Sequence, residues 1–410
     1  MSAGLVMLLG LATGQVEVVA IAVPLILVVV RGVTTSHAPD ITIDLEVDPD
    51  RLSESEAVTF TLTISSARPV ADLEIGLALP PVFEVLEGSP RTNLTLPDRE
   101  PVTLSIRTRA TRWGAHLVGV IALRSYGPGR MLVHGEVRDL RRVVKVFPRV
   151  EKLHRYIVPH KAQMSSGEYV SRLAGDGLEF ANVRRLVPGD SPRRVNWRVS
   201  SRSNQLYVNT FHVEKNSDVV FFIDAFGDVG TEGSTALDVT VRGVASLAQH
   251  YLGKRDCVAL ISFGGALRWL QGASGRSQIY RIIDFLLDVS VTTSLAWKDI
   301  TLVPPRILLP GSLVIAFSPL IDERSIGALG AIHERGAPLV VIDTLDERAV
   351  APSPGREGAL AHAVWLLRRD MFRRELATAG IPVTRMGGAT SLEEVLATIP
   401  RRRPIASGAS

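Results

Sequence analysis

Residues 218–224 read Asp-Val-Val-Phe-Phe-Ile-Asp, an unbroken apolar run that ends in a carboxylate. Such a run is typical of a strand that is buried on both faces of a parallel sheet. Apolar residues then recur at helical spacing, at Leu237, Val241, Val244, Leu247 and Tyr251. This spacing predicts an amphipathic helix, and a strand followed by a helix predicts an α/β domain from about residue 216 to residue 400.

The rest of this half repeats the same alternation. Strands are predicted at residues 257–263, 313–317 and 339–343, and helices at residues 278–287, 324–335 and 359–379. Gly264 and Gly265 predict a tight turn into a further strand at residues 267–270. Strands that alternate with helices predict an open, mostly parallel, Rossmann-like sheet with helices on both faces.

The region before it has a different periodicity. Apolar and polar side chains alternate in short runs at residues 41–47, 58–64, 73–79, 102–108, 116–123, 131–137 and 143–147. Period-two alternation with turn residues between the runs predicts an antiparallel, Ig-like β-sandwich over residues 38–147. No catalytic motif lies within it.

The first residues raise the question of membrane attachment. Residues 4–12 and 18–30 are uncharged and apolar, and residues 13–17 between them include Glu17. One span needs about 20 apolar residues, and neither run reaches that length. A single span made of both runs would place Glu17 near the middle of the bilayer, at a cost on the order of 3 kcal/mol. We therefore predict a transmembrane hairpin at residues 1–31, with a cleaved signal peptide and a buried helix as alternatives. The hairpin would place this protein in the cell membrane with both ends of the hairpin on one side. Because basic residues next to membrane segments favour the cytoplasmic side, Arg31 predicts that the soluble domains lie in the cytoplasm.

Composition narrows the function classes. A chain of 410 residues predicts two or three domains, and we expect residues 401–410 to form a disordered tail. The 46 basic and 42 acidic residues nearly balance, which argues against nucleic-acid binding. The single cysteine, Cys257, excludes an intramolecular disulfide and a cysteine metal site.

Residues 148–215 form an arginine-rich connecting module. A Pro188-Gly189-Asp190 turn lies among Arg184, Arg185, Arg193, Arg194, Arg198 and Arg202, with Trp197 close by. The pattern resembles the signature of the bacterial family called domain of unknown function 58. The matching positions are Glu179, Arg184, Gly189, Asp190, Arg194, Trp197 and Arg202; Asn196 stands where the family has Asp, and Ser201 where it has Ala.

Three interpretations of this module remain open. Its arginines could grip phosphates, because a guanidinium matches phosphate oxygens. They could form an internal network with Glu179 and Asp190, with Trp197 packed on a guanidinium. They could also form a protein-docking surface, where Trp and Arg are common anchors.

The second half resembles a von Willebrand factor A domain, in which a strand ends in Asp-x-Ser-x-Ser and helps to hold a divalent cation. Here that loop reads Asp224-Ala225-Phe226-Gly227-Asp228, and Asp322 follows a later strand. The resemblance suggests Asp224, Asp228 and Asp322 as ligands of Mg²⁺, with Thr292 or Thr293 as a further ligand. The alternative is that Asp224 caps its own loop and accepts a hydrogen bond from Ser318.

The family resemblance implies partnership with a MoxR-type AAA+ ATPase and with other von Willebrand A proteins. The sequence shows no His-Glu-x-x-His, Gly-x-Ser-x-Gly or phosphate-binding Gly-Lys motif. We therefore predict a membrane-anchored, non-enzymatic scaffold or interaction protein without a catalytic residue or a required cofactor. The alternative is a Mg²⁺-dependent hydrolase or transferase that uses the three aspartates.

Overall fold

The described part of the chain consists of two units with separate hydrophobic cores. The units are Met1–Pro148 and Arg149–Ser410. A computed structural model describes isolated positions between residues 12 and 30, and then residues 38–127, 133–154, 157, 179–187, 190–192, 195–203, 205–212, 218–231, 233–292, 299–309, 311–386 and 392–398. The predicted tail at residues 401–410 lies outside these ranges.

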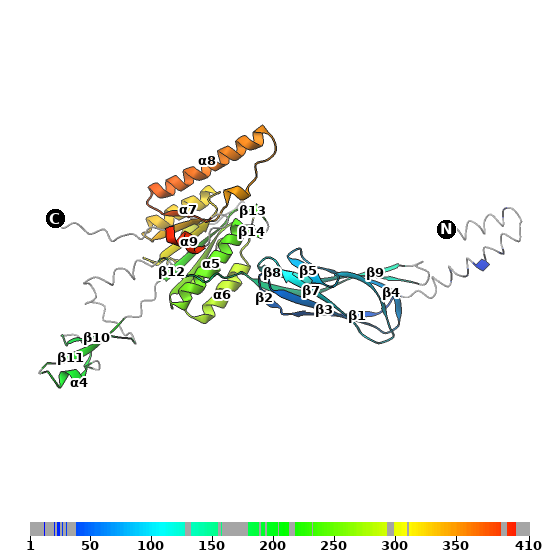
Figure 1. Cartoon of the computed structure of the whole chain (residues 1–410), viewed down its shortest axis with the longest axis horizontal. Coiled ribbons are helices and arrows are strands. Elements are labelled where there is room, and N and C mark those ends of the chain that lie inside the picture. Colours follow the sequence, from blue (N-terminus) through cyan, green and yellow to red (C-terminus); the bar gives the residue numbers. More distant parts are fainter. Residues whose placement is uncertain are drawn as a thin grey trace. The chain divides into compact units, whose positions relative to one another are not determined.

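The first unit contains two β-sheets (Figure 1). One sheet has the antiparallel order β1–β3–β7–β5, formed by Ile41–Asp48, Ala57–Ser66, Val102–Ala110 and Phe83–Glu87. The other has the order β2–β9–β8–β4–β6, formed by Arg51–Ser53, Val133–Phe147, Gly114–Tyr126, Val70–Ala78 and Arg91–Leu96. Alternate side chains of both sheets, such as Phe60 and Ile121, share one buried core.

This structure corrects the predicted fold class in two respects. Within the residues that the structure describes, no helix has the length and apolar character needed to cross a bilayer. The transmembrane hairpin predicted at residues 1–31 is therefore not supported, and most of those residues lie outside the described ranges. Each of its two apolar runs is also shorter than the about 20 residues that one span requires. The β-rich unit is not purely antiparallel either, because β2 pairs with β9 in parallel.

The second unit begins with a small hairpin. Strands β10 (Glu179–Arg185) and β11 (Tyr207–His212) pair in antiparallel fashion, and the short helix α4 (Trp197–Ser200) lies between them in the chain. Val195 makes an isolated bridge to Val208, and both side chains are buried. The hairpin and α4 therefore form one small folded module.

A six-stranded sheet follows, in the order β16–β15–β12–β17–β18–β19. All neighbouring pairs are parallel except β15 with β16. The strands are β12 (Asp218–Ala225), β15 (Cys257–Gly264), β16 (Arg268–Ala273), β17 (Leu313–Ser318), β18 (Leu339–Asp343) and β19 (Val383–Arg385). The helices are α5 (Ala236–Gly253), α6 (Arg276–Leu287), α7 (Glu323–Glu334), α8 (Arg356–Thr378) and α9 (Leu392–Thr398). Short pieces complete it: β13 (Gly230–Thr231), β14 (Ser234–Thr235) and two 3₁₀ turns at Ile300–Leu302 and Glu347–Ala349.

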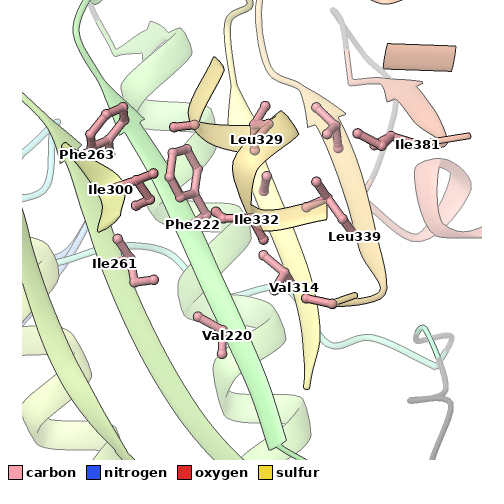
Figure 2. Packing of buried hydrophobic residues seen from close by; sticks show 14 of the residues in the cluster. Val220, Phe222, Ile261, Phe263, Ile300, Val314, Leu329, Ile332, Leu339 and Ile381 are labelled. Carbon is pink, nitrogen blue, oxygen red and sulfur yellow. The ribbon is translucent and has the colours of Figure 1, made fainter. Parts of the chain in front are cut away.

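Alternate residues of β12 serve opposite faces of this sheet. Phe221 lies next to Tyr251 of α5, with 6.1 Å between the ring centroids. Phe222 joins the cluster on the other face, with Leu329 of α7 (Figure 2). Both faces are covered by helices (Figure 1), which explains the unbroken apolar run from Val219 to Ile223.

Candidate functional site

Polar side chains meet where three neighbouring parallel strands end. β12 ends with Asp224 and Ala225, β17 ends with Ser318, and β18 ends with Asp343. Ser318 and Asp343 are register partners. All three polar residues are buried. The carboxyl edge of an open α/β sheet is the usual position of a ligand site.

Asp224 is held by its own loop and by the next strand. Its carboxylate accepts a 2.5 Å hydrogen bond from Ser318 Oγ and a 3.1 Å bond from the Phe226 backbone N–H. These contacts confirm the alternative role for Asp224 as a loop cap. Burial raises the pKa of Asp224 to about 6, and the negative charge of Asp322 adds to the rise. Ser325 lies close enough to lower this pKa, although its hydroxyl makes no hydrogen bond of normal geometry within the described structure.

The other two predicted metal ligands accept hydrogen bonds from the first turns of helices. Asp228 accepts a 3.0 Å hydrogen bond from Leu237 N–H at the beginning of α5. Asp322 is the N-cap of α7 and accepts from the backbone N–H, Nε and Nη2 of Arg324 at 2.9, 2.8 and 2.7 Å. The hydrogen bonds from the Arg324 guanidinium lower the pKa of Asp322.

Arg324 also covers the position where the resemblance places a serine ligand. Its guanidinium carbon lies 4.0 Å from the ring centroid of Phe226, and that ring packs edge-on against Phe263 at 5.0 Å. A guanidinium over an aromatic face is favourable by about 0.5–2 kcal/mol. An arginine therefore supplies the positive charge beside Asp322 and Phe226.

The predicted metal site stays a prediction. Among the described residues, no group of three or more His, Cys, Asp or Glu side chains is arranged to hold a metal ion. Asp224, Asp228 and Asp322 instead accept hydrogen bonds from protein donors. Thr292 is exposed, and Thr293 lies outside the described residues.

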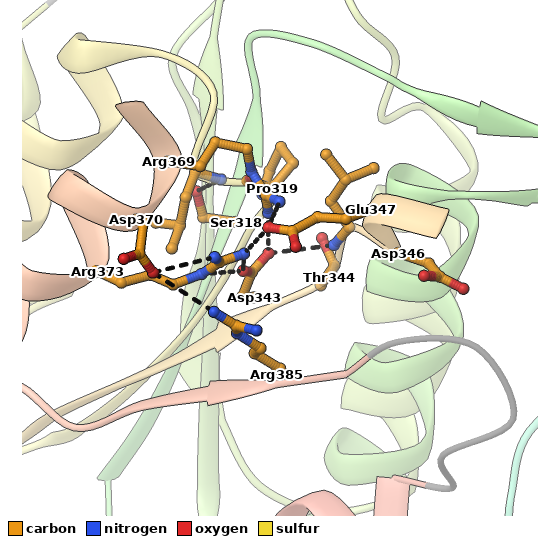
Figure 3. A network of polar contacts seen from close by, with 12 residues as sticks. Ser318, Pro319, Asp343, Thr344, Asp346, Glu347, Arg369, Asp370, Arg373 and Arg385 are labelled. Carbon is orange, nitrogen blue, oxygen red and sulfur yellow. Dashed lines mark hydrogen bonds and ion pairs between the residues drawn. The ribbon is translucent and has the colours of Figure 1, made fainter. Parts of the chain in front are cut away.

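A second charged network lies beside this edge and was not predicted from the sequence (Figure 3). Asp343 is buried and accepts from Arg369 Nη2 at 2.6 Å and from Arg373 Nη2 at 2.6 Å. Arg369 also donates to the Pro319 carbonyl oxygen, at 3.1 Å from Nε and 2.9 Å from Nη2. The guanidinium of Arg369 thus joins α8 to the loop after β17 and to the end of β18.

Glu347, Asp370 and Arg385 extend this network toward the surface. Glu347 accepts from Arg369 and Arg373 at 2.6 and 2.5 Å. Oδ1 of Asp370 lies 3.8 Å from Nη1 of Arg373 and 3.6 Å from Nη2 of Arg385. The Asp343–Arg369 pair is buried. Removing one partner from such a buried pair costs about 3–5 kcal/mol, because the remaining charge stays buried. One signal was available in the sequence: the apolar run at residues 339–343 ends in an acid, as the run at residues 218–224 does.

In the described part of the arginine-rich module, Arg184 and Asp190 form an ion pair. Arg184 donates to both oxygens of Asp190, at 2.8 and 2.7 Å, and the Val187 N–H donates to the same carboxylate at 2.8 Å. These hydrogen bonds lower the pKa of Asp190. Asn196 caps α4 by accepting from Val199 N–H at 3.1 Å, and its amide donates to Asn209 at 2.8 Å. An asparagine is as good a cap as an aspartate here.

The remaining signature residues differ in exposure. Trp197 has 69% of its surface exposed, and Arg198 and Arg202 are exposed as well. Glu179 is in β10, opposite His212 of β11. Gly189 and Arg194 lie outside the described residues. The structure thus pairs Arg184 with Asp190 and leaves Trp197 at the surface.

One family model matches part of the chain. Residues 182–351 match the family described as "Protein of unknown function DUF58". The match includes Arg184, Asp190, Trp197 and the strand ends Asp224 and Asp343, and it stops before the arginines of α8.

The similar curated proteins are themselves uncharacterized. The uncharacterized protein Rv1480 of Mycobacterium tuberculosis (strain ATCC 25618 / H37Rv) is 24% identical over 194 residues, which cover 45% of this chain. The uncharacterized protein Mb1516 of Mycobacterium bovis matches equally well. The chain spans 60% of the length of these relatives.

Solved structures add only weak likenesses. The C-terminal domain of wzt is 11% identical with a TM-score of 0.22, covering 28% of this chain and 78% of that domain. The cupredoxin domain of amoB from Nitrosocaldus yellowstonii is 14% identical with a TM-score of 0.21, covering 29% of this chain and 95% of that domain. Scores of this size support no statement about function.

Proposed function

We propose that this chain is a non-enzymatic scaffold that binds another protein through the surface around Trp197. One observation carries the proposal: Trp197 is 69% exposed within the family-matched region. A large exposed aromatic side chain is costly to leave in water, and Trp and Arg are the commonest anchors of protein interfaces. Arg198 and Arg202 are exposed in the same short segment.

The framework that carries Trp197 supports this role. Asn196, directly before Trp197, caps α4 and is tied to β11 through its amide. Val195 on the other side of Asn196 is anchored to β11 through its bridge to Val208. A preorganised anchor loses less conformational entropy on binding than a mobile one, so the local geometry suits docking.

The contacts at the sheet edge favour a scaffold over an enzyme. Asp322 and Asp343 are ion-paired to arginines of the same chain, and Asp224 hydrogen-bonds Ser318. A carboxylate used in this way must lose its contacts before it can act as a general base or a Mg²⁺ ligand. The edge therefore supports a structural use of these acids.

The partner in this proposal is a MoxR-type AAA+ ATPase, with other von Willebrand A proteins as further partners. Support comes from the match to DUF58 and from the features that carry the von Willebrand A resemblance, β12 with Asp224 near its end and β17 ending at Ser318. Phe226 in the position of a serine ligand is the main departure from that resemblance. An ATP-dependent partner would act on this chain in the cytoplasm.

The test measures binding of the purified chain to the MoxR-type ATPase of the same organism. We expect Trp197→Ala to weaken binding at least about 30-fold, since removing an interface anchor costs about 2 kcal/mol or more. Trp269→Ala is the matched control, because Trp269 is also exposed but lies on β16. Circular dichroism would show that both variants remain folded.

Two results would contradict the proposal. One is that the wild-type chain does not bind the ATPase with or without ATP. The other is that Trp269→Ala weakens binding as much as Trp197→Ala does, which would mean that the loss is not specific to the docking surface.

A further inference from the structure

Helix α8 is only partly used by the fold. Its buried residues are Arg369, Phe372, Arg373 and Leu376, all in its C-terminal half. Within residues 356–367 no side chain is buried. Figure 1 shows α8 on the outer side of its unit, where it extends past the sheet that its C-terminal half covers. In the N-terminal half the face that continues the buried row is only half-buried, at Gly358, His362, Trp365 and Leu366, and the opposite face carries several large apolar residues that are exposed.

Those apolar residues form one stripe, which we call the α8 seam. Its members are Leu360, Val364, Leu367 and Met371, with 66%, 57%, 66% and 67% of their surfaces exposed. Their spacing of four, three and four residues follows the alternation of a and d positions in the heptad of a two-helix coiled coil. A surface helix that faced only water would not need this pattern.

The seam has a charge of opposite sign at each end. Continuing the same spacing by three residues leads to Glu357 before Leu360 and to Arg374 after Met371. Both side chains are exposed, and that of Arg374 is 80% exposed even though it pairs with Asp370 at 3.0 Å. The heptad pattern thus has an acid at its N-terminal end and a base at its C-terminal end.

We propose that the α8 seam pairs with the α8 seam of a second copy of this chain, in antiparallel orientation. Antiparallel pairing about the midpoint of the seam sets Leu360 opposite Met371 of the other copy and Val364 opposite Leu367. It also sets Glu357 opposite Arg374 at both ends. Parallel pairing would place Glu357 against Glu357 and Arg374 against Arg374, so the charges select the antiparallel form.

The rest of the helix favours this occupant. Arg369 and Arg373 fix the C-terminal half of α8 to Asp343, so the seam is presented on a rigid element. From Glu357 to Arg374 the paired region is about 27 Å long, at about 1.5 Å per residue. A contact of this length buries on the order of 1,000 Å², which is at the lower limit for a specific interface. The dimer should therefore be weak, with dissociation in the micromolar range.

The test follows self-association of the full chain by sedimentation equilibrium. We expect Leu367→Glu to abolish the dimer, because it places a carboxylate in the centre of the apolar seam. Leu302→Glu is the matched control, since Leu302 is similarly exposed but lies outside α8, and it should leave dimerisation unchanged.

Charge reversal tests the orientation. Glu357→Arg and Arg374→Glu should each weaken the dimer about tenfold or more, because each creates like-charge contacts at both ends. The double variant should recover dimerisation, and an equimolar mixture of the two single variants should form a heterodimer. Circular dichroism would confirm that all variants keep their helix content.

Several results would overturn the inference. A wild-type chain that stays monomeric throughout the micromolar range would do so. This includes the case in which another segment of the same chain covers the seam, so that Leu367→Glu lowers only the stability of the monomer. A dimer that is unaffected by Leu367→Glu, or a double reversal that stays monomeric, would place the contact elsewhere. None of these results bears on Trp197, so the proposed docking function is tested independently.

Discussion

At the scale of single residues, Asp224 has an environment that opposes its charge. It is buried at the end of β12, with Ser318 as a donor, and burial raises its pKa from 3.8 to about 6. Asp322 adds a negative charge and Arg324 an opposing positive one. Between pH 3.8 and about 6 the folded state binds more protons than the unfolded state, so stability falls as the pH rises through this window.

Asp224→Asn should remove this penalty. The shift of the pKa from 3.8 to about 6 corresponds to on the order of 3 kcal/mol above the window. We expect the variant to be more stable than the wild type by about 1–3 kcal/mol at pH 7, since asparagine is uncharged, its Oδ1 can accept from the Phe226 N–H and its amide can donate to Ser318 Oγ. At pH 4 the two should be nearly equal. Urea unfolding at both pH values measures the difference.

Asp322→Asn provides the control of opposite sign. Its partner Arg324 lowers the pKa of Asp322, so the stability from this pair is present above the unfolded-state pKa of about 3.8 and is lost as the pH falls. Asparagine keeps the N-cap of α7. This variant should therefore be less stable than the wild type at pH 7, and an Asp224→Asn chain that behaves in the same way would contradict the burial argument.

Some of the site could be predicted from the sequence and some could not. Asp224 and its contact with Ser318 could be, because an acid that ends a buried strand meets the end of the neighbouring strand. The link from Asp343 to Arg369 spans 26 positions and depends on which face α8 turns to the sheet. The sequence pattern of α8 does not indicate that face. Two of its buried positions are arginines, Arg369 and Arg373, while the leucines of the seam are exposed.

At the scale of elements, the strands of the α/β sheet were predicted better than those of the β-rich unit. An apolar run such as residues 313–317 corresponds to β17 within one residue. Residues 131–137 and 143–147 were predicted as two strands, but the described residues 133–147 form one strand, β9. A register shift opposite Val118 and Val120 interrupts its alternation, and Arg141 has a positive φ there. β2, β5 and β6 were missed because few of their side chains are buried.

The packing of α5 on the sheet depends on a glycine. A Cβ added at Gly243 would lie 2.6 Å from Cε1 of Phe317 on β17. Gly243→Ala should therefore destabilise the unit by about 1–3 kcal/mol, because the helix or the ring must move. Gly327→Ala is the matched change on α7, where a new Cβ meets no atom within 4 Å. It should stabilise by about 0.5–1 kcal/mol through helix propensity.

Thermal and urea unfolding of these two variants would measure both effects. Opposite signs are the expected result, since the substitution is the same and only the neighbouring atoms differ. If both variants were destabilised alike, the close approach of α5 to Phe317 would not be the cause.

At the scale of the whole molecule, the two hydrophobic cores share no residue. Phe60 is fully buried in the core of the first unit and Phe222 in that of the second. A unit with its own core is expected to unfold on its own unless a large apolar interface couples it to its neighbour. We therefore expect two unfolding transitions for the intact chain in calorimetry, one for each side of Pro148.

Substitution of each phenylalanine assigns the transitions. Phe60→Ala should destabilise one of them by about 3–5 kcal/mol, through the loss of buried surface and the cavity left behind, and should leave the other in place. Phe222→Ala should do the reverse. If either variant shifted both transitions together, the units would be coupled and each could stabilise the other. If they are independent, partner binding at Trp197 and pairing through α8 should leave the transition of the first unit unchanged, because both surfaces belong to the second unit.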